Sequence, residues 1–349
     1  MKLGILTWFF GNNYGAKLHP FALQETLRSM GHDVSMINYH VPKAPLVNLF
    51  INLEYSRKKA LFHPFTLVKC LNKCRKFDRW TKSSFTISRK VTTAGGINSL
   101  GFDAIIIGSD EVFNYKHPFF SELYYGAGLD VPLIAYAPSS GAADTGKILD
   151  DGIIASLRKF RRLSARDYAT LELLRNNGLA DNAPVVLDPT LLYDFTFSEK
   201  PRSLPQGKFL LSYTFSKWDN LGPLIRSHAK SKKLRVVSVG GLRKWADWSC
   251  IDASVPEWLW LFQNASSVFT DSFHGVVFCL KYRKPFVMVS RPDKTNKIDG
   301  QLSLLGIKKT FWQGDSPYDD GVDYSGFDGR LEAAKSASID YLEDALRRL

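Results

Sequence analysis

The stretch KLGILTWFFGNNYGAKLHPFALQETLRSMGHDVSMINY, residues 2–39, carries the pattern that decides the fold. Its first run, KLGILTWF, is largely apolar and predicts a buried strand. Residues 18–31 predict a helix, because Pro20 lies near its first turn and Gly31 just past its end. Residues 33–39 predict the next strand. A strand, a helix and a strand in this order form a βαβ unit, so the predicted fold class is α/β with a parallel sheet.

The same alternation continues along the chain and divides it into two halves. Residues 197–208 are rich in Ser, Pro and Gly, which indicates a linker. The length of 349 residues also exceeds the usual size of one domain. We therefore expect two Rossmann-like domains, residues 1–197 and residues 198–349 with a C-terminal helix, that face a central cleft. In the second, Ser254 and Glu257 form a capping box that predicts a helix start. The further predicted strands are residues 102–110, 131–141, 161–167, 183–192, 209–215, 234–241, 267–275 and 284–290.

Basic residues are concentrated in one part of the first half. The chain has a formal net charge of +12, and residues 43–90 contain twelve Lys or Arg against only Glu54 and Asp78, a balance of +10. Aromatic and aliphatic residues are interleaved with these cations in a predicted helical insertion at about residues 43–92. Three interpretations stay open: a solvated basic insertion, a contact for an anionic membrane surface or a lipid-diphosphate-linked acceptor, and a nucleic-acid surface. Because no nucleic-acid-binding module is recognisable, we expect no nucleic acid.

The sequence favours a cytoplasmic protein, either free or peripheral on the inner face of the plasma membrane. The apolar run after Lys2 is interrupted too early for a signal peptide, and no stretch approaches the ~20 apolar residues of a membrane span. Four cysteines are too few for a disulfide framework in a chain of this length. Cys70 and Cys74 are one helical turn apart, but no second Cys or His pair has a matching spacing, so we expect no metal site.

Candidate site residues lie in the loops at the predicted strand ends, because open α/β sheets bind ligands beyond the carboxyl ends of their strands. Most of these loops contain several small or polar residues, whereas a plain connection would need only one turn residue. The loop GNNYG is interpreted as lining the cleft, with a plain strand-to-helix connection as the alternative. The candidates are Asn12, Asn13, Tyr14, Gly15, Ser109, Asp110, Glu111, Arg166, Gly240, Gly241, Ser272, His274 and Gly275.

The segment TDSFHG, residues 270–275, is the most informative of these loops. A strand is predicted to end at Thr270 or Asp271 and a helix to start near Gly275, so backbone N–H groups at the helix start favour an anion. His274 is then a group with an ordinary pKa near neutrality beside an anion site. A structural histidine is the alternative, but the position at a strand-to-helix turn of the cleft favours function.

Three other side chains could carry chemistry. Arg166 at a strand end can hold a carboxylate or phosphate through two parallel hydrogen bonds, with an ion pair to Asp167 or Asp188 as the structural alternative. Asp110 or Glu111 could be the general base for a sugar hydroxyl. For Asp110, a helix N-cap is the alternative.

Glycines at a further strand end indicate a close approach to a ligand. Gly240 and Gly241 let the backbone come near a bound molecule, although such pairs also occur in ordinary turns. Neither a Walker A motif nor a full dinucleotide fingerprint is present, so neither ATP nor NAD is expected.

Taken in order along the chain, these loops and their neighbours resemble the polysaccharide pyruvyl transferase family. The resemblance spans residues 1 to about 310, and TDSFHG after a helix that begins PEWL is its strongest element. It implies a GT-B-like fold of two Rossmann-like domains. The matching segments are GNNYGAKLHPFALQETL, FDAIIIGSDEVFN, IAYAPSSG, LSARD, LDPTLL and PEWLWLFQNASSVFTDSFHGVVFCLKYRKPFV.

The resemblance implies an enzyme that moves the carboxyvinyl group of phosphoenolpyruvate onto two hydroxyls of a sugar and releases phosphate. The product is a cyclic pyruvate ketal on a cell-surface glycan or its lipid-linked precursor, as in exopolysaccharide biosynthesis. The partners are then phosphoenolpyruvate and a sugar or lipid-linked oligosaccharide, and no cofactor is expected. Two alternatives remain: a GT-B sugar-nucleotide glycosyltransferase, and a non-catalytic protein of the same fold that binds glycan or membrane.

The resemblance also implies roles for individual residues. His274 is the expected general acid, either to C3 of the donor or to the leaving phosphate, and Arg166 holds the donor. Asp110 or Glu111 is expected to accept a hydroxyl proton, with an exchange of roles between His274 and the carboxylates as the alternative. The donor site, mainly on the second domain, is expected to include Arg166 from the first domain together with Gly240, Gly241, Ser272, His274, Gly275 and Lys297. The acceptor site in the first domain is expected to include Asn12, Asn13, Tyr14, Gly15, Ser109 and Asp110.

The chain departs from the family at three places. Glu111, Val112 and Phe113 stand where the family often has Gln-Val-Trp, and LHPF stands where it often has a Leu-Gln-Ala-Tyr type of run. Lys297 in TNKI occupies a position that is often Arg, and Lys294 is an alternative for the same role.

Overall fold

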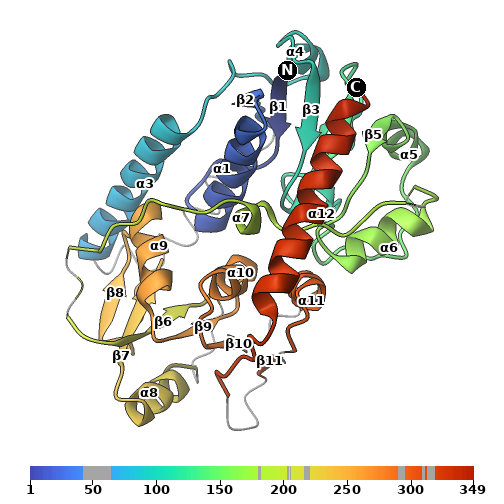
Figure 1. Cartoon of the computed structure of the whole chain (residues 1–349). Coiled ribbons are helices and arrows are strands. Elements are labelled where there is room, and N and C mark those ends of the chain that lie inside the picture. The colour runs from blue at the N-terminus through green and yellow to red at the C-terminus, as the bar shows by residue number, and fades with distance from the viewer. Residues whose placement is uncertain are drawn as a thin grey trace.

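The computed structural model describes the chain except for residues 42–63, 180–181, 203, 205, 216–220, 290–294, 309–310 and 313–318. Of the basic segment predicted at residues 43–92, the described part therefore begins with helix α3 (Pro64–Ser84). The described residues form two α/β domains, each built around one parallel sheet (Figure 1).

The first domain contains a five-stranded parallel sheet with the strand order β2-β1-β3-β4-β5. The pairing places Ile5 between Met36 and Ile106. The central strand is the run Ala-Ile-Ile-Ile, and all of its side chains are buried, as is usual in a parallel sheet. The strands are β1 (Lys2–Leu6), β2 (Asp33–Met36), β3 (Ala104–Ile107), β4 (Leu133–Ala135) and β5 (Phe160–Arg162). The helices are α1 (Tyr14–Ser29), α3, α4 (Ala94–Asn98), η1 (Glu111–Phe113), η2 (Glu122–Tyr125), α5 (Asp151–Leu157), α6 (Tyr168–Asn176) and α7 (Pro189–Leu192).

The second domain contains a six-stranded parallel sheet with the order β11-β10-β9-β6-β7-β8. The strands are β6 (Phe209–Tyr213), β7 (Arg235–Val239), β8 (Trp248–Cys250), β9 (Ser267–Thr270), β10 (Phe286–Val289) and β11 (Phe311–Trp312). The helices are α8 (Leu221–Ser231), α9 (Val255–Asn264), α10 (Phe273–Lys281), α11 (Thr295–Leu304) and α12 (Phe327–Arg347). None of the helices in the described part of the chain is both long and apolar enough to span a bilayer.

The predicted βαβ unit is confirmed by β1, α1 and β2, but α1 begins earlier than predicted. Asn13 is the N-cap and its side chain accepts a hydrogen bond from the backbone N–H of Ala16, so the helix starts at Tyr14. Pro20 consequently lies inside the helix instead of in its first turn. The predicted capping box of α9, formed by Ser254 with the third helical residue, is confirmed.

Two short strands were not predicted, and one predicted strand is absent from the described sheets. The strands β8 and β11 contain three and two residues, which is too short for a periodic pattern in the sequence. The prediction of a strand at residues 183–192 is wrong. That segment makes only an isolated bridge between Val185 and Ala165 and then forms α7, because Asp188 caps a helical turn that Pro189 begins.

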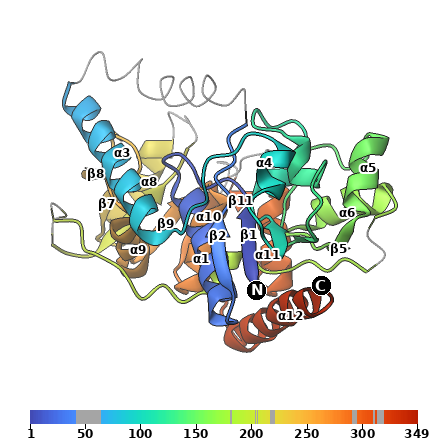
Figure 2. The same ribbon diagram turned by 90° about the horizontal axis from the view of Figure 1, so that it is seen from above.

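The two domains pack closely through helices at both ends of the chain. The Tyr14 hydroxyl donates to the carbonyl of Ala253, and the Tyr14 ring stacks on Trp258 with 5.3 Å between centroids. Helix α12 returns to the first domain, where the Tyr341 hydroxyl donates to the carbonyl of Ala135 in β4. Figures 1 and 2 accordingly show both termini close together on the first domain.

Candidate functional site

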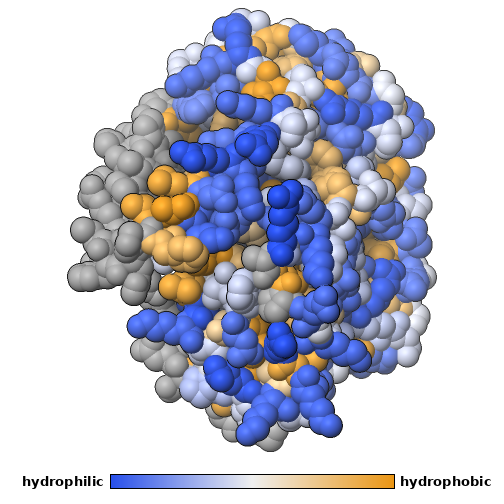
Figure 3. Space-filling model, turned by 90° about the vertical axis from the view of Figure 1, so that its left-hand side faces the viewer, coloured by the Kyte–Doolittle hydropathy of each residue, from blue (hydrophilic) through white to orange (hydrophobic). Residues whose placement is uncertain are grey.

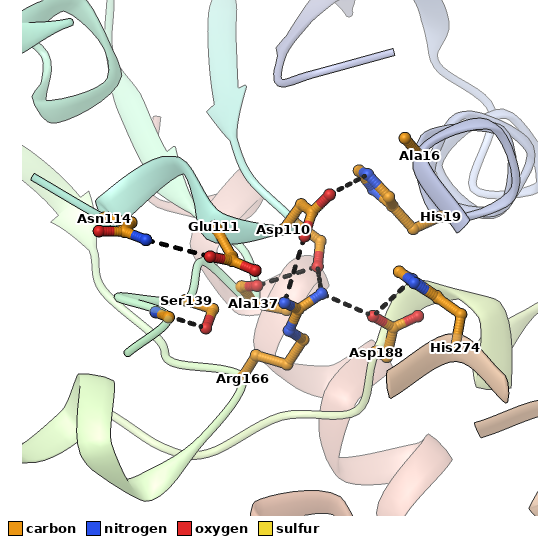
Figure 4. Close-up of polar contacts among 12 residues, drawn as sticks. Ala16, His19, Asp110, Glu111, Asn114, Ala137, Ser139, Arg166, Asp188 and His274 are labelled. Atoms are coloured by element: carbon orange, nitrogen blue, oxygen red, sulfur yellow. Dashed lines mark hydrogen bonds and ion pairs between the residues drawn. The ribbon is translucent and has the colours of Figure 1, made fainter. Parts of the chain in front are cut away.

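Five polar side chains from separate loops and helices meet between the two domains (Figure 4). We call His19, Asp110, Arg166, Asp188 and His274 the polar cluster. Arg166 bridges the two carboxylates, with Nη2 3.4 Å from Asp110 Oδ1 and Nη1 3.1 Å from Asp188 Oδ2. His19 Nε2 lies 3.5 Å from Asp110 Oδ2, and His274 Nε2 lies 3.8 Å from Asp188 Oδ2. The two imidazoles stack with 6.0 Å between centroids, which closes the ring of contacts.

The backbone at the end of β3 aims Asp110 into the polar cluster. Asp110 has a φ of 73°, a region that residues other than glycine rarely adopt and that costs about 1–3 kcal/mol. Its carbonyl accepts a hydrogen bond from the N–H of Ser139, which follows β4. Gly108 just before it has a φ of 115°, and a Cβ there would lie 2.2 Å from the Tyr136 carbonyl oxygen. Backbone strain of this kind is usual at functional sites.

Arg166 is fully enclosed by its contacts, with a side chain only 1% exposed. The guanidinium lies over the ring of Phe273 at 4.3 Å, and Nη1 also lies 3.5 Å from Ser109 Oγ. The ion pair with Asp188 that the sequence left as an alternative is present. Asp167, the other candidate, instead caps α6 through the N–H of Thr170.

Both carboxylates of the polar cluster are held in the ionised form. Burial alone would raise the pKa of Asp110, but contact with His19, the charge of Arg166 and the proximity of His274 hold that pKa well below its usual range. Burial likewise opposes ionisation of Asp188, yet His274 and Arg166 lower its pKa. The net effect is that Asp110 and Asp188 are anions at neutral pH.

His274 is neutral at physiological pH in the ligand-free protein. It lies in the first turn of α10, which begins at Phe273, two residues before the predicted start, with Ser272 as the N-cap. Burial lowers the pKa of His274 to about 4, and the nearby carboxylates of Asp188 and Asp110 only partly offset that effect. A neutral imidazole cannot act as an acid, so His274 must gain a proton when an anionic ligand binds if it is to donate one.

Four buried nitrogens of the polar cluster have no hydrogen-bond partner in the described part of the chain. They are His19 Nδ1, His19 Nε2, Arg166 Nε and His274 Nε2. Leaving a buried polar group without a partner costs about 1–3 kcal/mol, so a fold rarely collects several in one place. Arg166 Nε and His274 Nε2 are suited to the oxygen atoms of a bound anion.

Gly15 allows α1 to lie directly against His274. A Cβ at this position would be only 2.0 Å from His274 Nδ1. We therefore expect Gly15→Ala to displace the imidazole and to lower the activity of the protein by at least about tenfold, since an ångström of misplacement at a reacting group is costly. The matched control is Gly152→Ala in α5, where a Cβ would meet nothing within 4 Å. Equal activity of both variants would show that His274 needs no support from α1.

Other predicted site residues of the first domain have different surroundings. The Asn12 amide donates to Cys74 Sγ, Asn13 caps α1, and Tyr14 is buried in the interdomain core. Ser109 is fully buried and donates to the carbonyl of Ala137. Glu111 accepts from the Asn114 amide at 3.0 Å and points away from the ring of contacts, so Asp110 is the carboxylate that meets Arg166 (Figure 4).

The structure also shows the surroundings of the predicted site residues in the second domain. Gly275 lies against β9, because a Cβ there would be 2.0 Å from Thr270 Oγ1, and its N–H donates to the Ser272 hydroxyl. Gly240 has a φ of 86°, which explains the glycine there, whereas Gly241 faces open space. Lys297 is in the first turn of α11, but its side chain and the whole of Lys294 lie outside the described residues.

Sequence reasoning missed His19 and gave Asp188 only a structural role. Asp188 had a signal, because the loop LDPT is one of the predicted strand-end loops. His19 had none, because it falls inside a helical pattern whose other residues are mostly apolar. Its spacing of four from Gly15 places both on one helical face, and that becomes visible only once the start of α1 is known.

A large cavity lies next to the polar cluster but does not include it. Its volume is about 1090 Å³, and it is lined by α3, residues 199–202 and residues 242–257. The ion pair of Lys76 with Glu257 at 2.8 Å crosses between the domains there. In the described part of the chain, the lining residues Arg79, Arg202 and Lys244 have no ion-pair partner. Figure 3 shows this side of the molecule, where hydrophilic side chains border an apolar strip.

The cavity and the polar cluster are connected through the start of α1. Ala253 lines the cavity and accepts the hydrogen bond of the Tyr14 hydroxyl. The next residue, Gly15, contacts His274.

Comparison with known proteins gives a family match over most of the chain. A sequence model of the polysaccharide pyruvyl transferase family matches residues 13–293. No curated protein matches the sequence significantly.

Solved structures show the fold. A Listeria monocytogenes protein assigned as a UDP-N-acetylglucosamine 2-epimerase has 12% sequence identity and a TM-score of 0.51, with 98% of this chain and 88% of that chain covered. A Methanocaldococcus jannaschii UDP-GlcNAc 2-epimerase has 15% identity and a TM-score of 0.49, with 97% and 93% covered. A Streptomyces glycosyltransferase has 14% identity and a TM-score of 0.39, with 99% and 94% covered. The first of these likenesses, together with the two parallel sheets, shows the GT-B type of fold that the sequence predicts, with two Rossmann-like domains.

Proposed function

The chain belongs to the polysaccharide pyruvyl transferase family, and we propose that it transfers the carboxyvinyl group of phosphoenolpyruvate to two hydroxyls of a sugar and releases phosphate. The observation that carries the proposal is the polar cluster, where buried Arg166 Nε and His274 Nε2 have no hydrogen-bond partner among the described residues. Phosphoenolpyruvate carries a carboxylate and a phosphate, whose oxygens would satisfy those nitrogens.

The charges of the polar cluster support a coupling between donor binding and protonation. Arg166 contributes one positive charge against the two negative charges of Asp110 and Asp188, so the empty cluster is net negative when its histidines are neutral. A multiply charged anion can bind there only with additional cations. The phosphate of the donor would raise the pKa of His274 from about 4, so that His274 would gain the proton that the reaction needs. In this proposal Lys297 adds a further positive charge.

The proposed reaction uses three proton transfers, and the proton that Asp110 accepts returns to His274 through solvent before the next turnover. His274 donates a proton to C3 of the donor, which becomes a methyl group, and C2 becomes electrophilic. Asp110 accepts the proton of the first sugar hydroxyl, whose oxygen forms a bond to C2. The C2–O bond to phosphate breaks, a second hydroxyl of the same sugar attacks C2, and its proton leaves with the phosphate. Arg166 stabilises the departing phosphate by its fixed positive charge.

The acceptor is proposed to approach from the first domain and the adjoining cavity. Residues Asn12–Gly15, with Ser109 and Asp110, remain the proposed acceptor side. The cavity of about 1090 Å³ is much larger than a three-carbon donor needs, and it carries cations that have no ion-pair partner among the described residues. These properties support a longer, negatively charged acceptor, such as a glycan on a lipid diphosphate. A peripheral location on the inner face of the plasma membrane would bring the enzyme to that acceptor.

The proposal is tested by phosphate release from phosphoenolpyruvate with a panel of galactosides and mannosides, offered free and on lipid diphosphates. We expect release that depends on the acceptor and a product whose mass has increased by one pyruvyl group. A lower KM for diphosphate-linked acceptors would support the role of the cavity. If phosphoenolpyruvate does not bind while a sugar nucleotide does, the sugar-nucleotide glycosyltransferase is the better assignment.

A further inference from the structure

His19 occupies a position where the fold alone would favour an apolar residue. It lies in α1 among buried side chains such as Leu18, Ala22 and Leu23, and it is itself completely buried. Neither of its ring nitrogens makes a hydrogen bond in the described part of the chain, and Nε2 has a 3.5 Å contact with Asp110 Oδ2. A buried imidazole in such a helix is costly for stability and therefore needs an explanation in the site that it faces.

His19 contacts Asp110, the carboxylate that faces the proposed acceptor. Its Nε2 lies 3.5 Å from Asp110 Oδ2, while Arg166 Nη2 lies 3.4 Å from the other oxygen, Oδ1. The Asp110 side chain is 18% exposed, whereas those of His19 and Arg166 are 0% and 1% exposed. Asp110 thus lies between a buried histidine and a buried arginine (Figure 4), and its side chain is the most exposed of the three.

We infer that His19 is a positioning residue that acts through Asp110, and that its Nε2–H orients the carboxylate toward the hydroxyl of the acceptor. This inference rests on the proposed function. His19 does not touch the substrate in this arrangement, because it is buried behind Asp110. Its stacking on His274, with an interplanar angle of 16°, fixes the plane of the ring and thereby the direction of Nε2.

The same contact sets the acidity of Asp110. His19 on α1, Arg166 after β5 and His274 on α10 face the carboxylate, with Asp188 on the far side of Arg166. Loss of His19 would leave Asp110 with fewer favourable partners in a buried site and so raise its pKa. Because Asp110 works as an anion, activity would then be lost at a higher pH than in the wild type.

The test compares His19→Leu, which cannot donate, with His19→Gln, whose amide can. We expect His19→Leu to lower kcat by about 10- to 100-fold, the range for a hydrogen bond to a charged group. The acidic limb of its kcat/KM profile should move up by about 1–2 pH units. His19→Gln should restore most of kcat and most of the profile, while both variants bind phosphoenolpyruvate as the wild type does. Wild-type kcat and pH profile in His19→Leu would overturn the inference, as would equal losses in both variants.

A second measurement keeps this inference separate from the proposed function. In ¹⁵N-histidine spectra of the full chain, His19 should carry its proton on Nε2, and Asp110→Ala should remove that preference. An Nδ1–H tautomer in the wild type would overturn the inference even if the enzyme is active. If the wild type forms no ketal with any acceptor, the proposed function fails, and the spectra still decide whether His19 orients Asp110.

Discussion

His274→Gln should lower the rate of pyruvyl transfer by about 10²–10⁴-fold, the usual cost of losing a general acid. Glutamine retains a polar side chain of similar length but cannot deliver a proton to C3 of the donor. The same variant should lose the proton uptake that accompanies donor binding. In the free protein, burial holds the pKa of His274 near 4, and a bound dianion raises it, so binding takes up a proton between the two pKa values. Donor affinity should therefore increase as the pH falls through that range in the wild type and much less in the variant.

Titration calorimetry in two buffers of different ionisation enthalpy measures this uptake directly. His32→Gln is a matched control, because His32 lies at the turn before β2, outside the polar cluster. It should have the wild-type rate and proton uptake. Wild-type activity in His274→Gln would remove the histidine from the mechanism but leave the family assignment intact.

Substitution of Arg166 should have the largest effect on the protein as a whole. Arg166→Met leaves Asp110 and Asp188 in a buried site without their cation, and breaking such an arrangement costs about 3–5 kcal/mol of the free energy of unfolding. Arg166→Lys keeps the charge but lacks the planar fork that reaches both carboxylates, so we expect a smaller loss of stability and a KM for phosphoenolpyruvate that is at least about tenfold higher. Urea unfolding and steady-state kinetics measure the two effects separately.

The pH dependence of the Arg166→Met variant distinguishes this explanation from a simple packing defect. Without the guanidinium, the pKa values of Asp110 and Asp188 rise, and protonation at low pH relieves the penalty. The difference in stability between the variant and the wild type should therefore shrink as the pH falls. Arg162→Lys is the control, since the ion pair of Arg162 with Asp344 is about one-third exposed and should contribute at most about 1 kcal/mol. A constant difference across pH would contradict the electrostatic explanation.

Much of the fold could be predicted because its signals are local. Apolar runs that end in turn residues predicted β1, β3, β6, β7, β9 and β10. The capping box of α9 needs only residues three apart, and the sequence predicts it correctly. Asp110, Arg166 and His274 were each predicted as site residues because they lie at the ends of predicted strands. The structure brings the three together.

The remaining features depend on contacts that the sequence does not encode locally. His19 joins the polar cluster only because α1 begins at Tyr14 and crosses close to α10, which Gly15 permits. Tyr14 resembles a loop residue in the sequence, yet its ring fills the interdomain core against Trp258. The strand β11 pairs with β10 through only two residues, so its existence depends on its neighbour.

The return of α12 to the first domain has a consequence for how the protein unfolds. The chain passes from the first domain to the second after α7 and comes back through α12, whose Ser338 hydroxyl accepts from the Leu187 N–H while Tyr341 binds β4. Each half therefore completes the other, and neither is an autonomous folding unit. Heat or denaturant should remove both sheets in one cooperative transition, and a fragment that ends at the linker would lack part of its own core.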